Sequence, residues 1–224
     1  MINLEKTRFI VVRHGEADGN IIRIFHGQYN SKLTEDGHIQ ARRTADFLKN
    51  YKIDHIYSSD LNRTLSTAEH IANGRNMDIK TDSRLREIDG GRWENVPWDD
   101  LPKLYPESYG NWENDIAKTK MPDGESIEEM FERTTAAFSD IAAAHPGKTV
   151  CVVTHGTVLR ALVCLWRGVP LADMQKIPWF DNASVTIVDY TDSGYEMIEE
   201  GISRHLDGVS TFEKQDWWQK YSEQ

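Results

Sequence analysis

Two histidines, His14 and His155, stand at the ends of the two most apolar, β-branched runs of the chain. These runs, Phe9–Val12 and Thr149–Thr154, predict strands that are buried on both faces of a sheet. In open α/β sheets, ligands bind just beyond the carboxyl ends of the strands. Each histidine is also followed by a glycine, which allows the backbone to come close to a ligand. The two histidines therefore mark a candidate site.

Two arginines indicate what this site binds. Arg13 follows a buried strand, where an unpaired charge is costly, and Arg63 lies in the first turn of a predicted helix that follows another strand. A planar guanidinium holds phosphate oxygens with two parallel hydrogen bonds. The helix start at Gly156 adds backbone N–H donors and a positive dipole end. Together these features predict an anion site of the phosphate type.

A histidine beside a bound phosphate can also react with it. Neutral imidazole is a competent nucleophile near pH 7, and attack on phosphorus would split one hard hydrolysis into two easier steps through a phosphohistidine. The leaving alkoxide then needs a proton. Glu87 stands between apolar neighbours, where partial burial can raise the pKa of its carboxyl toward that of a general acid. Asp89, Glu94 and Glu16 remain alternatives for this role.

Composition limits the classes of function. The 224 residues include 26 basic and 36 acidic side chains, for a net charge of -10. Such a chain is a poor candidate for binding nucleic acid or an anionic membrane, because both require a positive field. The N-terminus lacks the order of a signal peptide, and no stretch has the roughly 18 apolar residues of a membrane span, so we expect a cytoplasmic protein. Cys151 and Cys164 lie in apolar runs and are expected to be buried thiols.

Strands alternate with helices along the chain. This order predicts one α/β domain over residues 1–224, with three layers (α/β/α) and a mostly parallel central sheet. The predicted strands are Phe9–Val12, Ile53–Tyr57, Asp78–Thr81, Thr149–Thr154, Ser184–Tyr190 and Tyr195–Ile198. The predicted helices cover residues 34–48, 60–72, 126–144 and 157–167. Thr34 and Ser126 are expected to cap the first and the third of them. The buried face of the first is expected to consist of Ile39, Ala41, Ala45 and Leu48.

The segment 90–123 breaks this alternation. It carries three tryptophans and four prolines and shows no clean helical or strand period. Long connections of this kind often form lids or binding loops, so we expect a partly helical flap over the carboxyl ends of the strands. Its tryptophans indicate either an apolar or planar leaving group or a small core of the flap itself. The tail has little pattern, and Trp217 and Trp218 are expected to dock on the body.

Five sequence blocks, in this order, resemble the histidine phosphatase superfamily, also called the phosphoglycerate-mutase-like family, over roughly residues 8–190. The first block is the tripeptide Arg13-His14-Gly15 with Glu16, which would be weak evidence by itself. The blocks and the matches between them are Arg13-His14-Gly15-Glu16, Asn20, Gly27-Gln28, Leu33-Thr34-Glu35-Asp36-Gly37, Ser58-Ser59-Asp60-Leu61 with Arg63-Thr64 and Thr67-Ala68, Leu85-Arg86-Glu87, Pro122-Asp123-Gly124-Glu125-Ser126 and Thr154-His155-Gly156.

The resemblance implies a role for each matching residue. His14 would be the nucleophile, Arg13, Arg63 and His155 the phosphate clamp, and Glu87 the proton donor to the leaving group and then the base for water. It implies hydrolysis without a metal or an organic cofactor, on a small phosphate monoester. Auxiliary contacts to the phosphate are expected from Asn20, Gly27, Gln28 and Gly156.

Three other hypotheses stay open beside a phosphatase. A phosphoglycerate mutase is disfavoured because the segment 90–115 is net acidic and lacks the basic insertion that mutase-type members share. A zinc hydrolase using His14, His155 and a carboxylate is disfavoured because two arginines would repel the metal. A phosphate-binding relative without activity is the third. The substrate and the oligomeric state cannot be predicted, and His26 is either a loop histidine or a substrate contact.

Overall fold

A six-stranded sheet forms the centre of the protein. The computed structural model describes residues 6–215. The spatial order of the strands is β3-β2-β4-β1-β5-β6, with parallel pairing from β3 to β1 and antiparallel pairing of β5 with β1 and β6. The strands are β1 (Thr7–Arg13), β2 (His55–Ser58), β3 (Ile79–Thr81), β4 (Thr149–Thr154), β5 (Val185–Thr191) and β6 (Gly194–Ile202).

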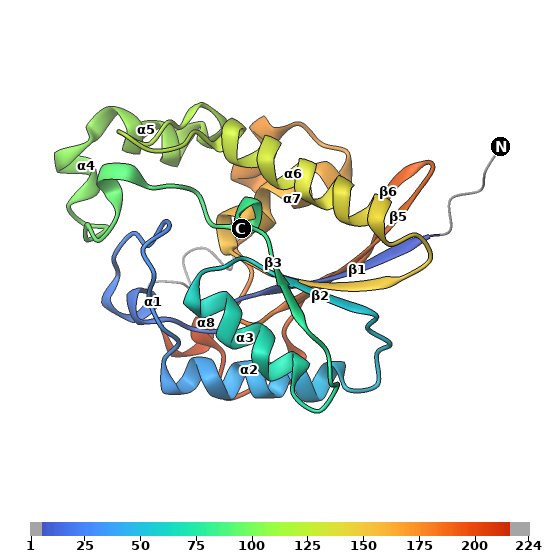
Figure 1. Cartoon of the computed structure of the whole chain (residues 1–224). Helices are drawn as coiled ribbons and strands as arrows, with labels where there is room; N and C mark the ends of the chain where they lie inside the picture. Colours follow the sequence, from blue (N-terminus) through green and yellow to red (C-terminus); the bar gives the residue numbers. More distant parts are fainter. Residues whose placement is uncertain (1–5, 216–224) are drawn as a thin grey trace.

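Helices cover both faces of this sheet. The long helices α2 (Glu35–Leu48) and α3 (Asn62–Ala72) lie on one side, and α6 (Ile127–Ala144) and α7 (Gly156–Arg167) lie on the other (Figure 1). Strand β1 contributes side chains to the hydrophobic cores on both faces of the sheet, because successive side chains of a strand point to opposite faces. Its Phe9 and Val11 pack into the core under α6 and α7, and Ile10 and Val12 into the core under α2 and α3. The predicted three-layer α/β fold with a mostly parallel sheet is confirmed.

Local signals in the sequence fix where three of these helices begin or end. The Thr34 side chain accepts a hydrogen bond from the Gly37 N–H and caps α2. Ser126 and Glu129 form a reciprocal capping box at the start of α6. Gly168 ends α7 in the left-handed conformation, with φ of 66°.

Two predicted elements begin two residues later in the structure. The strand predicted from Ile53 begins at His55, and the preceding residue, Asp54, exchanges hydrogen bonds with the Thr149 backbone through its own N–H and its carboxylate. The helix predicted from residue 60 begins at Asn62, after Leu61 in an extended conformation. Both shifts leave the connected elements in the predicted order.

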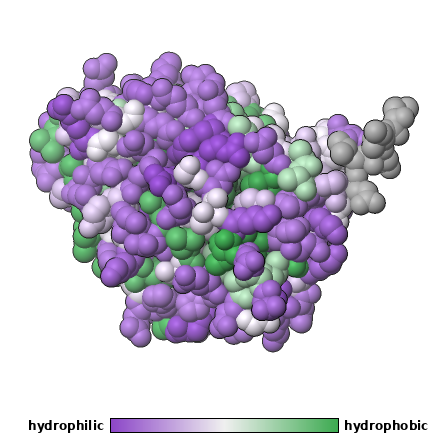
Figure 2. All heavy atoms as spheres, in the orientation of Figure 1, coloured by the Kyte–Doolittle hydropathy of each residue, from purple (hydrophilic) through white to green (hydrophobic). Residues whose placement is uncertain are grey.

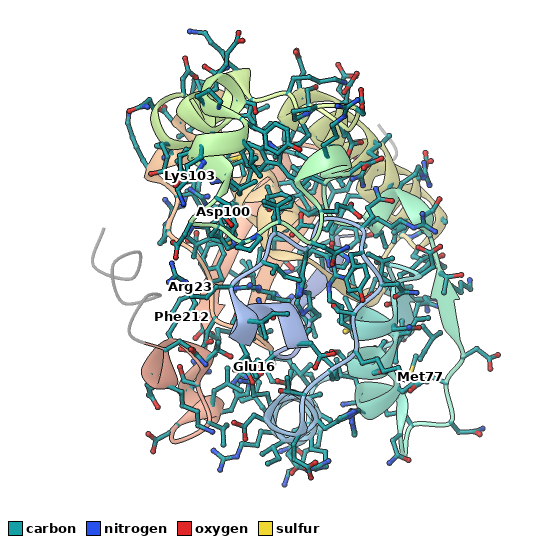
Figure 3. The ribbon with its side chains drawn as sticks, turned by 90° about the vertical axis from the view of Figure 1, so that its left-hand side faces the viewer. Glu16, Arg23, Met77, Asp100, Lys103 and Phe212 are labelled. Carbon is teal, nitrogen blue, oxygen red and sulfur yellow. The ribbon has the colours of Figure 1, made fainter. Side chains whose placement is uncertain are left out.

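The flap, residues 90–123, is partly helical, as predicted. It is joined to the loop after α1 by backbone hydrogen bonds between Phe25 and residues Asn95 and Val96, and between Trp98 N–H and Arg23 O. In Figure 3 Arg23 lies below the flap residues Asp100 and Lys103. The remaining helical segments are α1 (Asp18–Ile22), η1 (Ser83–Leu85), η2 (Gly91–Trp93), α4 (Leu101–Leu104), α5 (Pro106–Asn114), η3 (Ile116–Lys118), η4 (Leu171–Lys176), η5 (Arg204–Leu206) and α8 (Thr211–Lys214).

The surface and the ends of the chain complete this description. In the orientation of Figure 1 the surface is mostly hydrophilic, with hydrophobic residues scattered among polar ones (Figure 2). Within residues 6–215, no helix has the length and apolar character needed to cross a membrane. Both cysteines are buried free thiols, as predicted. The predicted docking of Trp217 and Trp218 concerns residues outside the described range.

Candidate active site

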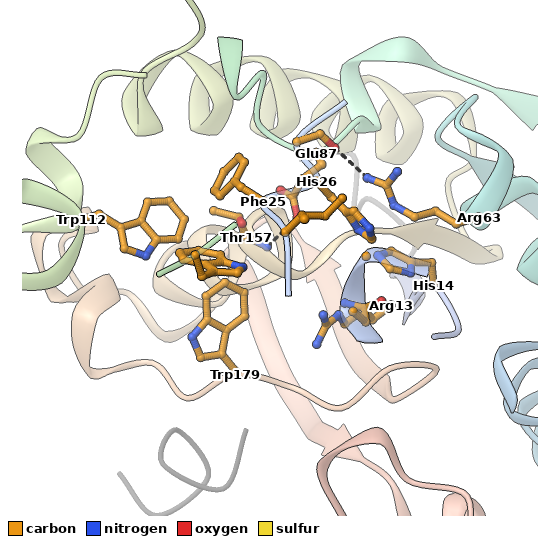
Figure 4. A pocket seen from close by; sticks show the side chains of 14 residues that line it. Arg13, His14, Phe25, His26, Arg63, Glu87, Trp112, Thr157 and Trp179 are labelled. Atoms are coloured by element: carbon orange, nitrogen blue, oxygen red, sulfur yellow. Dashed lines mark hydrogen bonds between the residues drawn. The ribbon is translucent and has the colours of Figure 1, made fainter. Parts of the chain in front are cut away.

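A pocket opens at the carboxyl ends of β1 and β4, where the sequence places the two histidines. Its volume is about 60 Å³, room for a group of roughly the size of phosphate. Arg13 and His14 reach it from the end of β1, Arg63 from the first turn of α3, Glu87 from the loop after β3 and Thr157 from the start of α7 (Figure 4). The rest of the lining consists of Gly19, Asn20, Ile24, Phe25, His26, Gly27, Trp98, Trp112 and Trp179.

The imidazole of His14 has one nitrogen available for chemistry. Its Nδ1 lies 2.7 Å from the carbonyl oxygen of Gly15. A carbonyl only accepts, so Nδ1 carries the proton and Nε2 carries the lone pair. The residue is held from both sides, because its N–H donates to Thr154 O (3.0 Å) and its carbonyl accepts from Ala183 N–H (3.1 Å). The fold therefore presents a fixed, neutral imidazole with Nε2 free to attack.

The second histidine lies beside the first. The ring centroids of His14 and His155 are 5.3 Å apart, with the rings at 60° to one another. His155 is fully buried, and its Nε2 lies 3.0 Å from Ser59 Oγ. Its Nδ1 is buried without a hydrogen-bond partner among the described residues. An acceptor or donor supplied by a ligand would satisfy this nitrogen.

Two buried arginines supply positive charge. Arg63 donates to Tyr29 O and to Gly27 O, both at 2.8 Å, and its Nε is buried with no partner within the described part of the chain. Arg13 donates to Phe180 O. Burial lowers the pKa of each guanidinium to about 10, so both remain charged at neutral pH. A doubly cationic pocket in a protein of net charge -10 is suited to an anion.

The same surroundings keep the histidines neutral. Burial, followed by the charges of Arg63 and Arg13, holds the pKa of His14 well below its usual value. The pKa of His155 is also held well below that value, first by burial and then by Arg63. His26 also lines the pocket, and burial with the two arginines lowers its pKa to about 3. The imidazoles are therefore unprotonated at physiological pH.

Glu87 is the carboxylate that reaches the pocket. Its Oε1 accepts from its neighbour Ile88 N–H (2.9 Å), and its Oε2 accepts from Thr157 N–H (3.1 Å) at the start of α7. The three rival carboxylates do not line the pocket. Glu16 is buried and accepts hydrogen bonds from Thr34 and Thr211 hydroxyls, Glu94 accepts from the N–H groups of Gln28 and Gly90, and Asp89 accepts from Gly91 N–H.

The auxiliary residues divide into two groups. Asn20 and Gly27 line the pocket. Gln28 does not line it, since its amide donates to Glu87 O (3.3 Å) and its oxygen accepts from Arg86 (3.3 Å). Gly156 also lies outside the lining, but a Cβ there would come within 3.2 Å of the Arg13 guanidinium. Gly156 therefore makes room for the arginine, and Gln28 supports the loop that carries Glu87.

Sequence reasoning missed two residues behind His14. Asn182 is buried, and its Nδ2 donates to His14 O (3.1 Å). Asp181 is buried, accepts from Ser210 Oγ (2.5 Å) and stabilises the charge of Arg13. Neither stands after an apolar strand, and only the antiparallel pairing of β5 with β1 brings this turn behind the nucleophile. The sequence carried no local signal for them.

Within residues 6–215, no group of three or more histidines, cysteines and carboxylates is placed to hold a metal ion. A neutral imidazole with a free Nε2, two buried guanidiniums and a carboxylate at a helix start instead define a site for phosphoryl transfer.

Comparison with known proteins agrees with this class. A sequence profile of the Histidine phosphatase superfamily (branch 1) matches residues 9–202, so the chain belongs to this family. The predicted family and the class of phosphate-ester hydrolase are thereby confirmed.

Individual relatives of both reaction types are similar to the chain. Phosphoserine phosphatase 1 of Hydrogenobacter thermophilus is 31% identical, covering 89% of this chain and 94% of its own. A Salmonella arizonae protein named "Probable phosphoglycerate mutase GpmB" is 36% identical, covering 92% and 97%. The solved structure of Bacillus stearothermophilus YhfR is 32% identical, with a TM-score of 0.86 over 89% of this chain and 99% of its own.

Proposed function

We propose that the protein hydrolyses phosphate monoesters of small metabolites through a phosphohistidine at His14. The observation that carries the proposal is the hydrogen bond from His14 Nδ1 to Gly15 O, which leaves Nε2 unprotonated beside two buried guanidiniums. Phosphate bound between Arg13, Arg63 and His155 would place its phosphorus next to that nitrogen. Positive groups around the equatorial oxygens would then stabilise the charge that redistributes in the transition state.

The reaction has two steps. In the first, the His14 Nε2 lone pair forms a bond to phosphorus, the P–O ester bond breaks, and protonated Glu87 gives its proton to the leaving alkoxide. In the second, the Glu87 carboxylate takes a proton from water, whose oxygen attacks phosphorus while the P–N bond breaks. His14 leaves as a neutral imidazole, Glu87 is protonated again, and inorganic phosphate departs. Asn20 and Gly27 would contact the bound phosphate.

Hydrolysis is favoured over mutase chemistry by the charge of the flap. A mutase must hold a second acidic group of its substrate while the phosphate is transferred back. The segment 90–115 is net acidic, and Arg13 and Arg63 are the only arginines among the described pocket residues, which include no lysine. We infer that the flap, residues 90–123, covers the substrate within a single domain. Cytoplasmic location stays a prediction.

The test is hydrolysis of p-nitrophenyl phosphate in excess chelator near pH 6, with rapid-quench trapping of acid-labile phosphoprotein. We expect turnover and trapped label in the parent, and neither in His14→Ala. The matched control is His55→Ala, which removes a histidine from β2 outside the pocket and should keep both. Turnover that survives in His14→Ala would refute the phosphohistidine route. Interconversion of phosphoglycerate isomers that needs a bisphosphate primer would favour a mutase.

A further inference from the structure

The pocket has two chemically different sides. In Figure 4 Arg13, His14 and Arg63 lie on one side, and Phe25, Trp112 and Trp179 on the other. With Trp98, these three aromatic residues form what we call the aromatic wall. The centroid of the Trp112 ring lies 5.7 Å from Phe25, 5.9 Å from Trp98 and 6.5 Å from Trp179. Such spacings are typical of packed aromatic clusters, so the wall is a preformed surface.

The sequence left open whether the flap tryptophans are core or contact surface, and the structure divides them. Trp93 is fully buried and lies outside the pocket lining. Trp98 and Trp112 line the pocket, and Trp98 is only partly buried. Trp179, from the loop before β5, is also partly buried and extends the wall. Part of the ring surface is therefore accessible to a substrate.

Trp179 lies next to the phosphate clamp residue Arg13. A Cβ placed on Gly156 would lie 3.1 Å from the Trp179 ring and 3.2 Å from the Arg13 guanidinium, so both flank the same point. The guanidinium carbon of Arg160 lies 4.5 Å from the centroid of the Trp179 ring and forms a cation–π contact with it. Arg160 also donates to Ile177 O (2.9 Å) and Met174 O (2.8 Å), which holds the loop that carries Trp179. A group attached to the bound phosphate therefore meets a fixed indole.

No charged side chain of the aromatic wall lines the pocket, and Arg160, which contacts the Trp179 ring, is not part of the lining. The aromatic wall contributes no ionisable side chain, and Arg13 and Arg63 are the only described guanidiniums in the lining. Both are committed to the phosphate in the proposed mechanism. A carboxylate two or three bonds from the ester oxygen would thus lose its water against aromatic rings without gaining an ion pair with a side chain of the pocket lining.

We propose that the aromatic wall selects phosphate monoesters whose alcohol carries an aromatic or other planar apolar group close to the ester oxygen. Alcohols that carry a carboxylate there, as those of phosphoserine and phosphoglycerate do, are discriminated against. The inference rests on the proposed phosphatase activity, because it assigns the leaving-group side of the same pocket.

The test compares 2-phenylethyl phosphate, ethyl phosphate and O-phosphoserine, none of which is an activated aryl ester. We expect kcat/KM for 2-phenylethyl phosphate to exceed that for ethyl phosphate by about tenfold or more, the size of a modest apolar contact. Phosphoserine is expected to be the poorest of the three. Trp179→Ala should lower this preference about tenfold, and Trp179→Phe should retain most of it.

A buried tryptophan outside the pocket gives the matched control. Trp166 on α7 is buried, and its indole N–H has no hydrogen-bond partner among the described residues, so Trp166→Phe removes no polar contact. The ratio of the two kcat/KM values should stay at the parent value in this variant. A fall as large as in Trp179→Ala would mean that loosened packing, and not the wall, sets the preference.

Binding of non-hydrolysable 2-phenylethylphosphonate and ethylphosphonate, measured by calorimetry, separates this inference from the proposed function. Absence of turnover on every ester would refute the phosphatase, while tighter binding of the phenylethyl compound, lost in Trp179→Ala, would still support the wall. Equal affinities for the two phosphonates would refute the proposed selectivity of the aromatic wall without contradicting the phosphatase activity. The same holds if phosphoserine is the best ester.

Discussion

The buried histidines of the pocket should make the free protein sensitive to acid. His14, His26 and His155 are all held neutral, first by burial and then by the positive charge of Arg63. In the unfolded chain the same imidazoles take up a proton with a pKa of about 6.5. Because the pKa values are lower in the folded state, the unfolded state binds more protons below pH 6.5. Stability is therefore complete above that pH and falls as the pH decreases.

The size of the effect follows from linkage. Between pH 7 and pH 5, a histidine that stays neutral in the folded state and titrates at about 6.5 when unfolded costs about 2 kcal/mol. The pKa of His26 is lowered to about 3, so this residue alone removes about 2 kcal/mol from the free energy of unfolding. The lowered pKa values of His14 and His155 act in the same direction, against a whole stability of about 5–15 kcal/mol for a typical domain.

The assay is urea unfolding at pH 7, 6 and 5 in a buffer free of phosphate. His26→Asn removes one of the three histidines, and its free energy of unfolding should fall by about 2 kcal/mol less than that of the parent between pH 7 and 5. Saturating inorganic phosphate should also weaken the pH dependence of the free energy of unfolding in the parent protein, because a bound anion favours the protonated imidazoles in the folded state.

Two results would refute this reasoning. One is a parallel loss of stability in the parent and in His26→Asn over the whole pH range. The other is a nitrogen NMR titration of the folded protein that places the pKa of His26 near 6.5. Either result would mean that the pocket admits enough water, or enough negative charge, to solvate the imidazolium.

Three further predictions concern the site. Glu87→Gln should slow hydrolysis of ethyl phosphate about a hundredfold more than that of p-nitrophenyl phosphate, because only the poor leaving group needs a proton; equal slowing would remove Glu87 from the acid role. Arg63→Lys should lower kcat/KM by about 10²–10³, since one ammonium cannot hold Gly27 O, Tyr29 O and phosphate together, and an unchanged inhibition constant for phosphate would contradict this contact. Gly19→Ala would put a Cβ 1.7 Å from the His26 ring; we expect a displaced ring and a raised KM, whereas parent kinetics and Tm would show that the ring is not confined.

The elements of the fold were predictable where the sequence carries a local signal. Apolar β-branched runs predicted β1 and β4, and the capping residues Thr34 and Ser126 predicted where α2 and α6 begin. The buried face of α2 was less predictable. Ile39 and Ala45 were expected inside but are only partly buried, while Gln40 and Thr44 are fully buried. Gln40 is stabilised there by hydrogen bonds to Glu16 N–H, Val209 O and Thr211 Oγ1, which are contacts that no helical period encodes.

The sequence by itself determined which residues could do the chemistry: His14, Arg13, Arg63, Glu87 and His155 stand in recognisable blocks at the ends of elements. Their residue types fix what each can donate, accept or attack. Only the tertiary structure decided how they combine. The pairing of β1 with β4 brings the histidine rings to 5.3 Å, burial with Arg63 keeps them neutral, and the loop before β5 adds Trp179. Burial and proximity depend on residues far apart in the chain, so no local pattern of amino acids specifies them.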